Sequence, residues 1–150
     1  MWSKIALVPP KFEILEHPAD VGFLAYGVTL EELFANAALA MISIAGDAES
    51  VRETERREID VIGENEEALL YAWLAEILAV MDAERLALRR AEVTELATHA
   101  GGGRVRGVVY GEPYDRTRHQ SGVAIKAVTY HQFGIERIAS GWRARVFLDL

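Results

Sequence analysis

Two aspartates near opposite ends of the chain are the side chains best suited to chemistry. Asp20 follows the run His17-Pro18-Ala19 and precedes Val21-Gly22, whereas Asp149 is the last residue but one. Glycine beside Asp20 allows close approach of an ion or a second backbone. Carboxylate oxygens are the ligands that calcium, magnesium and manganese prefer. If the two chain ends meet, Asp20, Asp149 and the terminal carboxylate of Leu150 form an oxygen-only site for a divalent cation.

Lys126 is a second residue whose setting calls for a partner. It lies within the apolar run Val123–His131, which favours a central strand. An unpaired buried ammonium is costly, so this lysine must reach water or find an anion. Asp20 is the expected neighbour.

Three histidines could support the proposed metal site. His17, His119 and His131 would shift the preference toward a transition metal if any of them joined the carboxylates. The purely structural alternatives remain open for these residues. Asp20 also suits a turn, Asp149 a solvated chain end, and His131 the end of a strand.

The overall composition limits the classes of function. A length of 150 residues fits one domain, 1–150, in which residues 1–10 form a leader with no assigned role. The net charge of -7 disfavours direct strong binding to nucleic acid. The absence of cysteine excludes disulfides, thiolate metal sites and thiol catalysis. No stretch predicts a secretory signal or a membrane span, so a cytoplasmic protein is expected.

Two amphipathic segments predict the helices that position these residues. The first covers about 30–44, because Thr29 and Glu32 form a capping box ahead of a helical apolar stripe. The second covers about 66–84, where Asn65 suits the N-cap and Trp73 and Met81 belong to a wide apolar face. We interpret these two side chains as core residues rather than as the lining of a ligand pocket.

The remaining segments predict strands, and the fold class is therefore α+β: a compact single domain with mixed or antiparallel sheets. Val51–Ile62 is expected to be an edge strand, because its mixed charges discourage strand-to-strand aggregation. The other predicted strands are Lys11–Glu16, Val21–Val28, a hairpin from Leu86 to Tyr110 that turns at 101–103, Val123–His131 and Trp142–Leu150. A polar loop covers Gly111–Gly122, a type of segment in which function concentrates.

Several motifs together resemble the archease family, in order and spacing, over nearly the whole chain from about Lys11. They are His17-Pro18-Ala19-Asp20-Val21-Gly22, Tyr26-Gly27, Thr29-Leu30-Glu31-Glu32, Leu69-Leu70, Trp73-Leu74, Gly111-Glu112-Pro113-Tyr114-Asp115 with His119, Lys126-Ala127-Val128-Thr129-Tyr130-His131, and Val146-Phe147-Leu148-Asp149-Leu150. The block that begins at Lys126 and the aspartate ending are the specific parts. Pro18 departs from the family pattern, which usually has threonine there.

The resemblance implies a non-catalytic activator of an RtcB-type RNA ligase that acts in tRNA splicing and repair. Such a protein promotes guanylylation of the ligase's active-site histidine with GTP and a divalent metal, and so restores multiple turnover. The family's metal-binding positions match Asp20, Asp149 and Leu150, and its required lysine matches Lys126. Calcium is the first expectation for the metal, with magnesium or manganese as alternatives. The partner is the ligase, and tRNA is contacted only through it.

Two other classes of function remain as alternatives. One is a stand-alone metal-dependent hydrolase, with Asp20 and Asp149 as ligands and His17 or His131 as general base. No local run supplies the three or four side-chain ligands and the activating base that such enzymes use. The other is a general chaperone or scaffold module, which would bind many unfolded clients without regard to metal.

Overall fold

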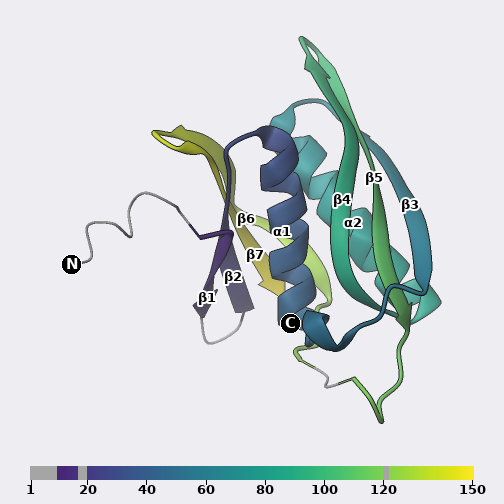
Figure 1. Ribbon diagram of the computed structural model, residues 1–150. Helices are drawn as coiled ribbons and strands as arrows, with labels where there is room; N and C mark the ends of the chain where they lie inside the picture. Colours follow the sequence, from purple (N-terminus) through teal and green to yellow (C-terminus); the bar gives the residue numbers. More distant parts are fainter. Residues whose placement is uncertain (1–9, 17–19, 120–121) are drawn as a thin grey trace.

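The computed structural model describes residues 10–16, 20–119 and 122–150, and they form the α+β fold expected (Figure 1). Both predicted helices are confirmed. The elements in order are β1 (Phe12–Glu16), β2 (Asp20–Gly27), α1 (Leu30–Ala45), the short 3-10 helix η2 (Ala48–Ser50), β3 (Glu55–Gly63), α2 (Glu66–Glu84), β4 (Leu86–His99), β5 (Gly102–Pro113), β6 (Ala127–Ile138) and β7 (Gly141–Asp149). Residues 1–9 of the predicted leader 1–10 lie outside the described residues, as do His17 and Pro18.

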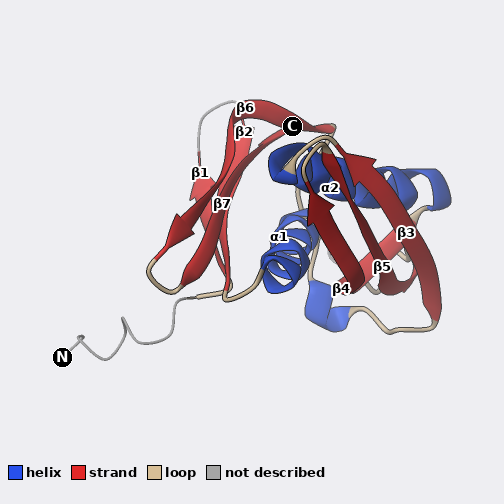
Figure 2. Cartoon of the chain, turned by 90° about the horizontal axis from the view of Figure 1, so that it is seen from above, coloured by secondary structure: helices blue, strands red, loops and turns tan. Residues whose placement is uncertain are grey.

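Two antiparallel sheets enclose the helices. One sheet has the strand order β1-β2-β7-β6 and the other has the order β3-β5-β4. Helix α1 packs against β2 and β4, and α2 packs against β3 and β6, so both helices lie between the sheets (Figure 2). Among the described residues, no helix covers the outer face of either sheet.

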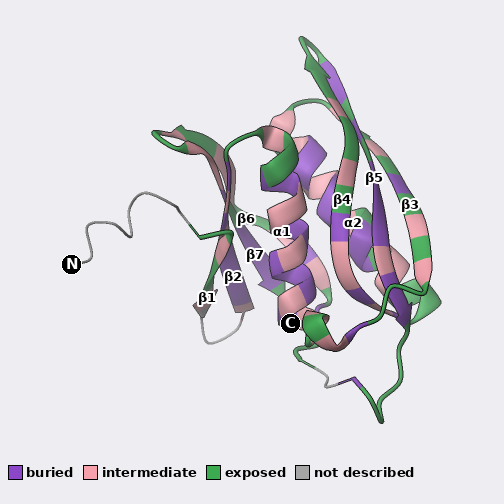
Figure 3. Cartoon of the chain, viewed as in Figure 1, coloured by how far each residue is buried: buried purple, intermediate pink, exposed green. Residues whose placement is uncertain are grey.

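The local sequence explains the two helices and their burial. The Thr29 hydroxyl accepts a hydrogen bond from the Glu32 amide, and the Asn65 side chain accepts one from the Ala68 amide. Each interaction satisfies an amide that the first helical turn leaves free. Because sheets cover the helices on both sides, buried positions occur around much of the helix surface (Figure 3). Trp73 is fully buried, as expected of a core residue, and Met81 packs against the core.

The charged strand was correctly predicted to be an edge. β3 lies outermost in its sheet, and among the described strands it pairs with β5 alone. Its exposed charges form ion pairs with neighbours, including Arg104 with Asp60 at 2.6 Å and Arg57 with Glu84 at 2.7 Å. The predicted hairpin is also present as β4 and β5, with its turn at residues 100–101.

The predicted central strand Val123–His131 is confirmed only for residues 127–131, and its start and its central position in the sheet are wrong. β6 begins only at Ala127, continues to Ile138, and lies at the edge of its sheet. The amides of Gly122 and Val123 donate instead to the carbonyls of Ala45 and Ile44 at the end of α1. These helix-terminal carbonyls hold the segment away from the sheet, so Lys126 lies exposed before the strand begins.

Two side chains of α2 form hydrogen bonds with backbone groups of the edge strand β6. The Tyr71 hydroxyl donates to the Val128 carbonyl at 2.9 Å, and the Glu67 carboxylate accepts from the Ile135 amide at 3.0 Å. An edge strand otherwise presents such groups to other chains.

Within the described residues, no helix is both long and apolar enough to cross a membrane.

Candidate functional site

The structure brings the two predicted aspartates together. Asp20, the first residue of β2, is directly opposite Asp149, the last residue of β7. Directly opposite residues of antiparallel strands project to the same face, with their Cβ atoms about 4.5–5.5 Å apart. Asp149 is exposed and Asp20 is half-buried. Two carboxylates from distant parts of the sequence therefore share one accessible place on the outer face of the sheet.

The local electrostatics favour a cation between these carboxylates. Neither side chain has a hydrogen bond or ion pair with any residue that the structure describes. Like charges in directly opposite positions repel each other, and a bound cation removes this repulsion. The donors are oxygens only, which suits calcium, magnesium or manganese. The donor set of Asp20 and Asp149 thus fits a hard divalent cation.

The described part of the chain supplies a small ligand set. No group of three or more histidine, aspartate or glutamate side chains suited to a metal occurs within residues 10–16, 20–119 and 122–150. Leu150 follows Asp149 directly, and its side chain packs against the core. Magnesium is often held by one or two carboxylates, with water or phosphate oxygens completing its coordination. A site of this kind remains open to a second molecule.

Lys126 lies at the same end of the strands. Its amide donates to the Asp149 carbonyl at 2.8 Å, and the next residue, Ala127, is the register partner of Asp149. The ammonium is exposed and has no ion pair within 4.0 Å among the described residues. The lysine therefore borders the aspartate pair through its backbone, while its side chain reaches solvent rather than forming an ion pair with Asp20.

The three histidines have different settings. His131 is exposed and packs edge-on against Phe147, with 5.7 Å between ring centroids. Phe147 lies two residues before Asp149 on β7, and its register partner Gly22 lies two residues after Asp20 on β2. His131 therefore lies near the aspartate pair on this sheet. His17 lies outside the described residues, and His119 belongs to another cluster.

His119 is buried with Glu112 at the base of the polar loop. Its Nε2 is 2.9 Å from the Glu112 carboxylate, and its Nδ1 accepts a hydrogen bond from the Asp115 amide at 2.9 Å. The ring therefore carries its proton on Nε2 and donates to Glu112. The same carboxylate accepts from the Arg52 amide at 2.7 Å and from the Arg118 guanidinium. His119 thus fastens a loop, and its bonds do not connect it to either aspartate.

These contacts strongly favour the ionised form of Glu112. The hydrogen bond from the Arg52 amide, followed by those from His119 and Arg118, lowers the pKa of Glu112 from 4.5 to about 2. Hydrogen bonds to a carboxylate stabilise its charged form, and here they outweigh burial, which acts in the opposite direction. The loop therefore starts from a firmly ionised anchor.

Comparison with known proteins places this geometry in a family. Residues 12–150 match the model of the Archease protein family (MTH1598/TM1083). The chain belongs to the archease family. Archease from Methanosarcina mazei is 39% identical over 140 residues, which cover 93% of this chain and 96% of that protein. Archease from Pyrococcus abyssi is 37% identical over 141 residues, covering 93% and 99%.

Two solved structures resemble this archease family member. The solution structure of protein 1598 from Methanobacterium thermoautotrophicum has a TM-score of 0.81 at 35% identity, covering 93% of this chain and 99% of that one. A crystal structure from Thermotoga maritima, described as an archease and possible chaperone, has a TM-score of 0.58 at 19% identity, covering 91% and 94%. The second likeness bears on the fold alone.

Sequence reasoning missed two features of this archease family member. Glu112 was placed in a polar loop, yet it is buried and organises that loop. Its signal was the density of hydrogen-bonding residues from Glu112 to His119, which did not reveal their mutual contacts. The irregular course of β6 near Gln132 had no comparable signal, because a long bulge depends on the partner strand.

Proposed function

We propose that this archease family member is a non-catalytic accessory protein of an RtcB-type RNA ligase. It promotes GTP-dependent guanylylation of the ligase and thereby its multiple turnover in tRNA splicing and repair. The family match over residues 12–150 supports this assignment. The structural observation that carries it is the direct pairing of Asp20 with Asp149 at an exposed place bordered by Lys126.

The site itself would work through charge and position. Asp20, Asp149 and Leu150 hold a divalent cation, with calcium the first candidate and magnesium or manganese the alternatives. When bound, such a cation supplies positive charge next to phosphate oxygens. Lys126 places an unpaired ammonium at the same strand end, where it attracts an anionic group of the ligase complex. The two aspartates keep the cation on an exposed face that a partner's active site can reach.

An accessory role suits this geometry better than independent hydrolysis. Hydrolytic metal sites usually combine three or more protein ligands with an activating base. The described residues offer two adjacent side-chain carboxylates, and His131 has no hydrogen bond that would orient it toward them. A partner that contributes further ligands completes the site. Contact with tRNA then occurs through the ligase.

The decisive experiment measures covalent guanylylation of an RtcB-type ligase with GTP, with and without this protein, at limiting metal. We expect stimulation by the native chain and its loss in Asp20→Asn, Asp149→Asn and Lys126→Ala. Asp82→Asn, an exposed change on α2, is the matched control and should retain full stimulation. Full stimulation by both site-aspartate variants would remove the metal site from the mechanism.

Assays of the protein without the ligase separate the alternative functions. Phosphatase or nuclease turnover by the purified chain, lost in Asp149→Asn, would indicate an independent enzyme. Competition of unrelated unfolded proteins for ligase binding, insensitive to metal, would indicate a general chaperone. We expect neither result.

A further inference from the structure

The course of β6 is interrupted opposite the middle of β7. Thr129 pairs with Phe147 and Gly134 pairs with Arg145, so residues 130–133 of β6 stand against Val146 alone. Gln132 has a backbone φ of 53°, in the left-handed region that residues other than glycine seldom adopt. Such strained conformations concentrate at functional places, which makes the bulge a candidate for one.

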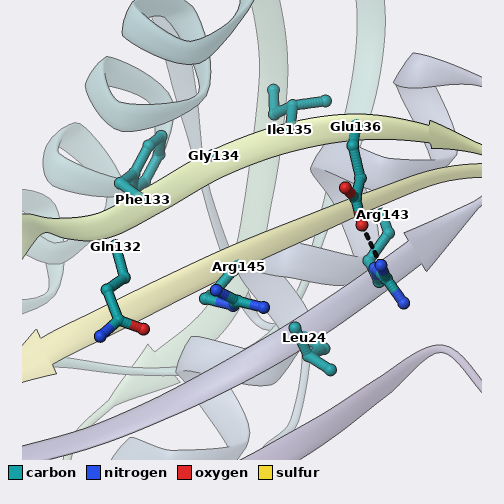
Figure 4. A pocket seen from close by; sticks show the side chains of 8 residues that line it. All are labelled: Leu24, Gln132, Phe133, Gly134, Ile135, Glu136, Arg143 and Arg145. Atoms are coloured by element: carbon teal, nitrogen blue, oxygen red, sulfur yellow. Dashed lines mark hydrogen bonds and ion pairs between the residues drawn. The ribbon is translucent and has the colours of Figure 1, made fainter.

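A hollow of about 310 Å³ opens beside this bulge on the outer face of the sheet (Figure 4). It is lined by Leu24 of β2, Arg143 and Arg145 of β7, and residues 132–136 of β6. Arg143 forms an ion pair with Glu136. Arg145 is exposed and has no hydrogen bond or ion pair with any described residue. The hollow therefore has an uncompensated positive charge in a chain whose net charge is -7.

Aromatic rings of the bulge pack on the side of β6 that faces α2, where they are held in fixed positions. Tyr130 is 65% exposed, yet its ring stacks on Tyr71 of α2 with centroids 3.9 Å apart and an interplanar angle of 7°. Phe133 packs edge-on against both rings, at 5.8 and 6.0 Å. Tyr71 is itself fixed by its hydrogen bond to Val128. An exposed ring that is already immobilised loses little conformational entropy when another molecule covers it.

We propose that Leu24, Gln132 and Arg145 on the outer face, together with Tyr130 and Phe133 on the α2 side of the β6 edge, dock a partner protein. These five residues are here termed the bulge patch. The partner wraps this edge and places a carboxylate on Arg145 and an apolar side chain on Tyr130. Arginine and tyrosine are the residues that most often dominate protein interfaces, and a guanidinium can hold a carboxylate by two parallel hydrogen bonds. This inference rests on the proposed function, in which the partner is the RNA ligase.

The position of the bulge patch connects it with the aspartate pair. Arg145 and Asp149 lie four residues apart on β7 and so project to the same face, about 13 Å from each other along the strand. A partner seated on the bulge patch reaches the aspartates without covering them. The bulge patch then supplies affinity and orientation, and the aspartates and Lys126 act at the ligase's reacting groups.

The charges favour a protein over a nucleic acid at this patch. A nucleic-acid strand presents successive phosphates and needs several cations. Among the described residues that line the hollow, Arg145 is the one cation without an ion pair. Glu136 lies in the same hollow, and the aspartate pair lies further along the face. One carboxylate among apolar groups complements this pattern, whereas a chain of phosphates is repelled by the flanking acids.

The test measures the dissociation constant and the association rate constant for binding of an RtcB-type ligase to the full chain and to its variants. We expect Arg145→Glu to weaken binding by about tenfold or more and to slow association, and Tyr130→Ser to weaken it by a similar factor. Arg145→Lys should recover part of the affinity, because it keeps the charge but not the two-pronged geometry. Arg56→Glu is the matched control, since Arg56 is exposed and unpaired on the outer face of the other sheet, among the described residues.

The outcomes distinguish failure of the bulge patch from failure of the proposed function. Unchanged affinity for both Arg145→Glu and Tyr130→Ser, with the native chain binding normally, overturns the bulge patch and leaves the proposed function intact. Failure of the native chain to bind or stimulate the ligase overturns the proposed function. Binding of single-stranded RNA by the native chain alone, lost in Arg145→Glu, assigns the patch to nucleic acid and also overturns the inference. Arg145→Gln, which removes only the charge, replaces Arg145→Glu if the reversal prevents folding.

Discussion

At the scale of single residues, Glu112 links the loop to the protein's response to acid. Its carboxylate is bonded by the Arg52 amide, His119 and Arg118, and its pKa lies at about 2 in the folded chain. A carboxyl whose pKa is lowered on folding stabilises the native state above its ordinary pKa. This stabilisation disappears as the pH falls from about 4.5 towards 2, because the unfolded chain takes up the proton first.

We therefore expect Glu112→Gln to reduce stability at neutral pH and to flatten the loss of stability between pH 4.5 and 2. Urea unfolding midpoints at pH 7, 4 and 3 measure both effects. Glu58→Gln, an exposed change on β3, is the control and should follow the native pH profile. A native-like acid profile in Glu112→Gln would show that other carboxyls dominate acid unfolding.

The aspartate pair predicts effects of opposite sign with and without metal. In chelator, Asp149→Asn should raise the free energy of unfolding by about 0.2–1 kcal/mol, because it removes repulsion with Asp20. With metal at a hundred times its dissociation constant, the native chain should gain about 2.7 kcal/mol and the variant should gain much less.

Thermal unfolding in chelator, calcium, magnesium and manganese measures this difference without any ligase. The largest shift identifies the preferred ion, and Asp82→Asn should respond as the native chain does. Equal metal-induced shifts in the native chain and in Asp149→Asn would contradict a metal site at this residue.

At the scale of elements, local sequence determined the helices and failed for β6. The caps at Thr29 and Asn65 and the apolar periodicity gave both helices to within about a residue of their observed ends. The β6 prediction failed because Gly122 and Val123 bond to the end of α1, and because the bulge depends on β7. Neither contact leaves a local pattern. The aspartates could be chosen by residue type, but their pairing arises from the contact between β2 and β7, the two central strands of their sheet.

The segment after His119 predicts a positional effect on Lys126. A Cβ atom at Gly122 would lie 2.3 Å from the Ile44 carbonyl, so Gly122→Ala should displace the segment and cost about 1–3 kcal/mol of stability. Stimulation of the ligase should fall as well, since Lys126 follows this contact by a few residues. Urea unfolding and the guanylylation assay measure the two effects.

Gly134→Ala provides the control for stability. A Cβ at Gly134 meets only the Glu67 carboxylate at 3.5 Å, an ordinary contact, so this change should leave the unfolding free energy nearly unaltered. Native stability in Gly122→Ala would contradict this prediction, because it would show that the segment can shift away from the Ile44 carbonyl at no cost.

At the scale of the whole molecule, Trp73 joins the layers. It is fully buried on α2, and its indole N–H donates to the Phe34 carbonyl on α1 at 3.0 Å. A Cβ at Gly107 on β5 would lie 2.6 Å from the ring, so the indole packs closely on the sheet. Both helices and one sheet therefore depend on one side chain.

Trp73→Ala should cost about 3–5 kcal/mol of unfolding free energy. Trp73→Phe should cost less, since it keeps an aromatic ring and loses only the indole donor and some volume. Chemical unfolding followed by circular dichroism measures both. A loss below about 1 kcal/mol in Trp73→Ala would show that the layers are held mainly by other contacts.

The bonds from Tyr71 and Glu67 to β6 also bear on how the protein behaves when it is concentrated. A protein with an exposed sheet face can aggregate if the edge strand of that sheet pairs with the same strand of another copy. Because α2 already bonds the Val128 carbonyl and the Ile135 amide, β6 has fewer free backbone groups with which another chain could pair. The second helix thereby opposes edge-to-edge aggregation while the outer face of the sheet stays exposed.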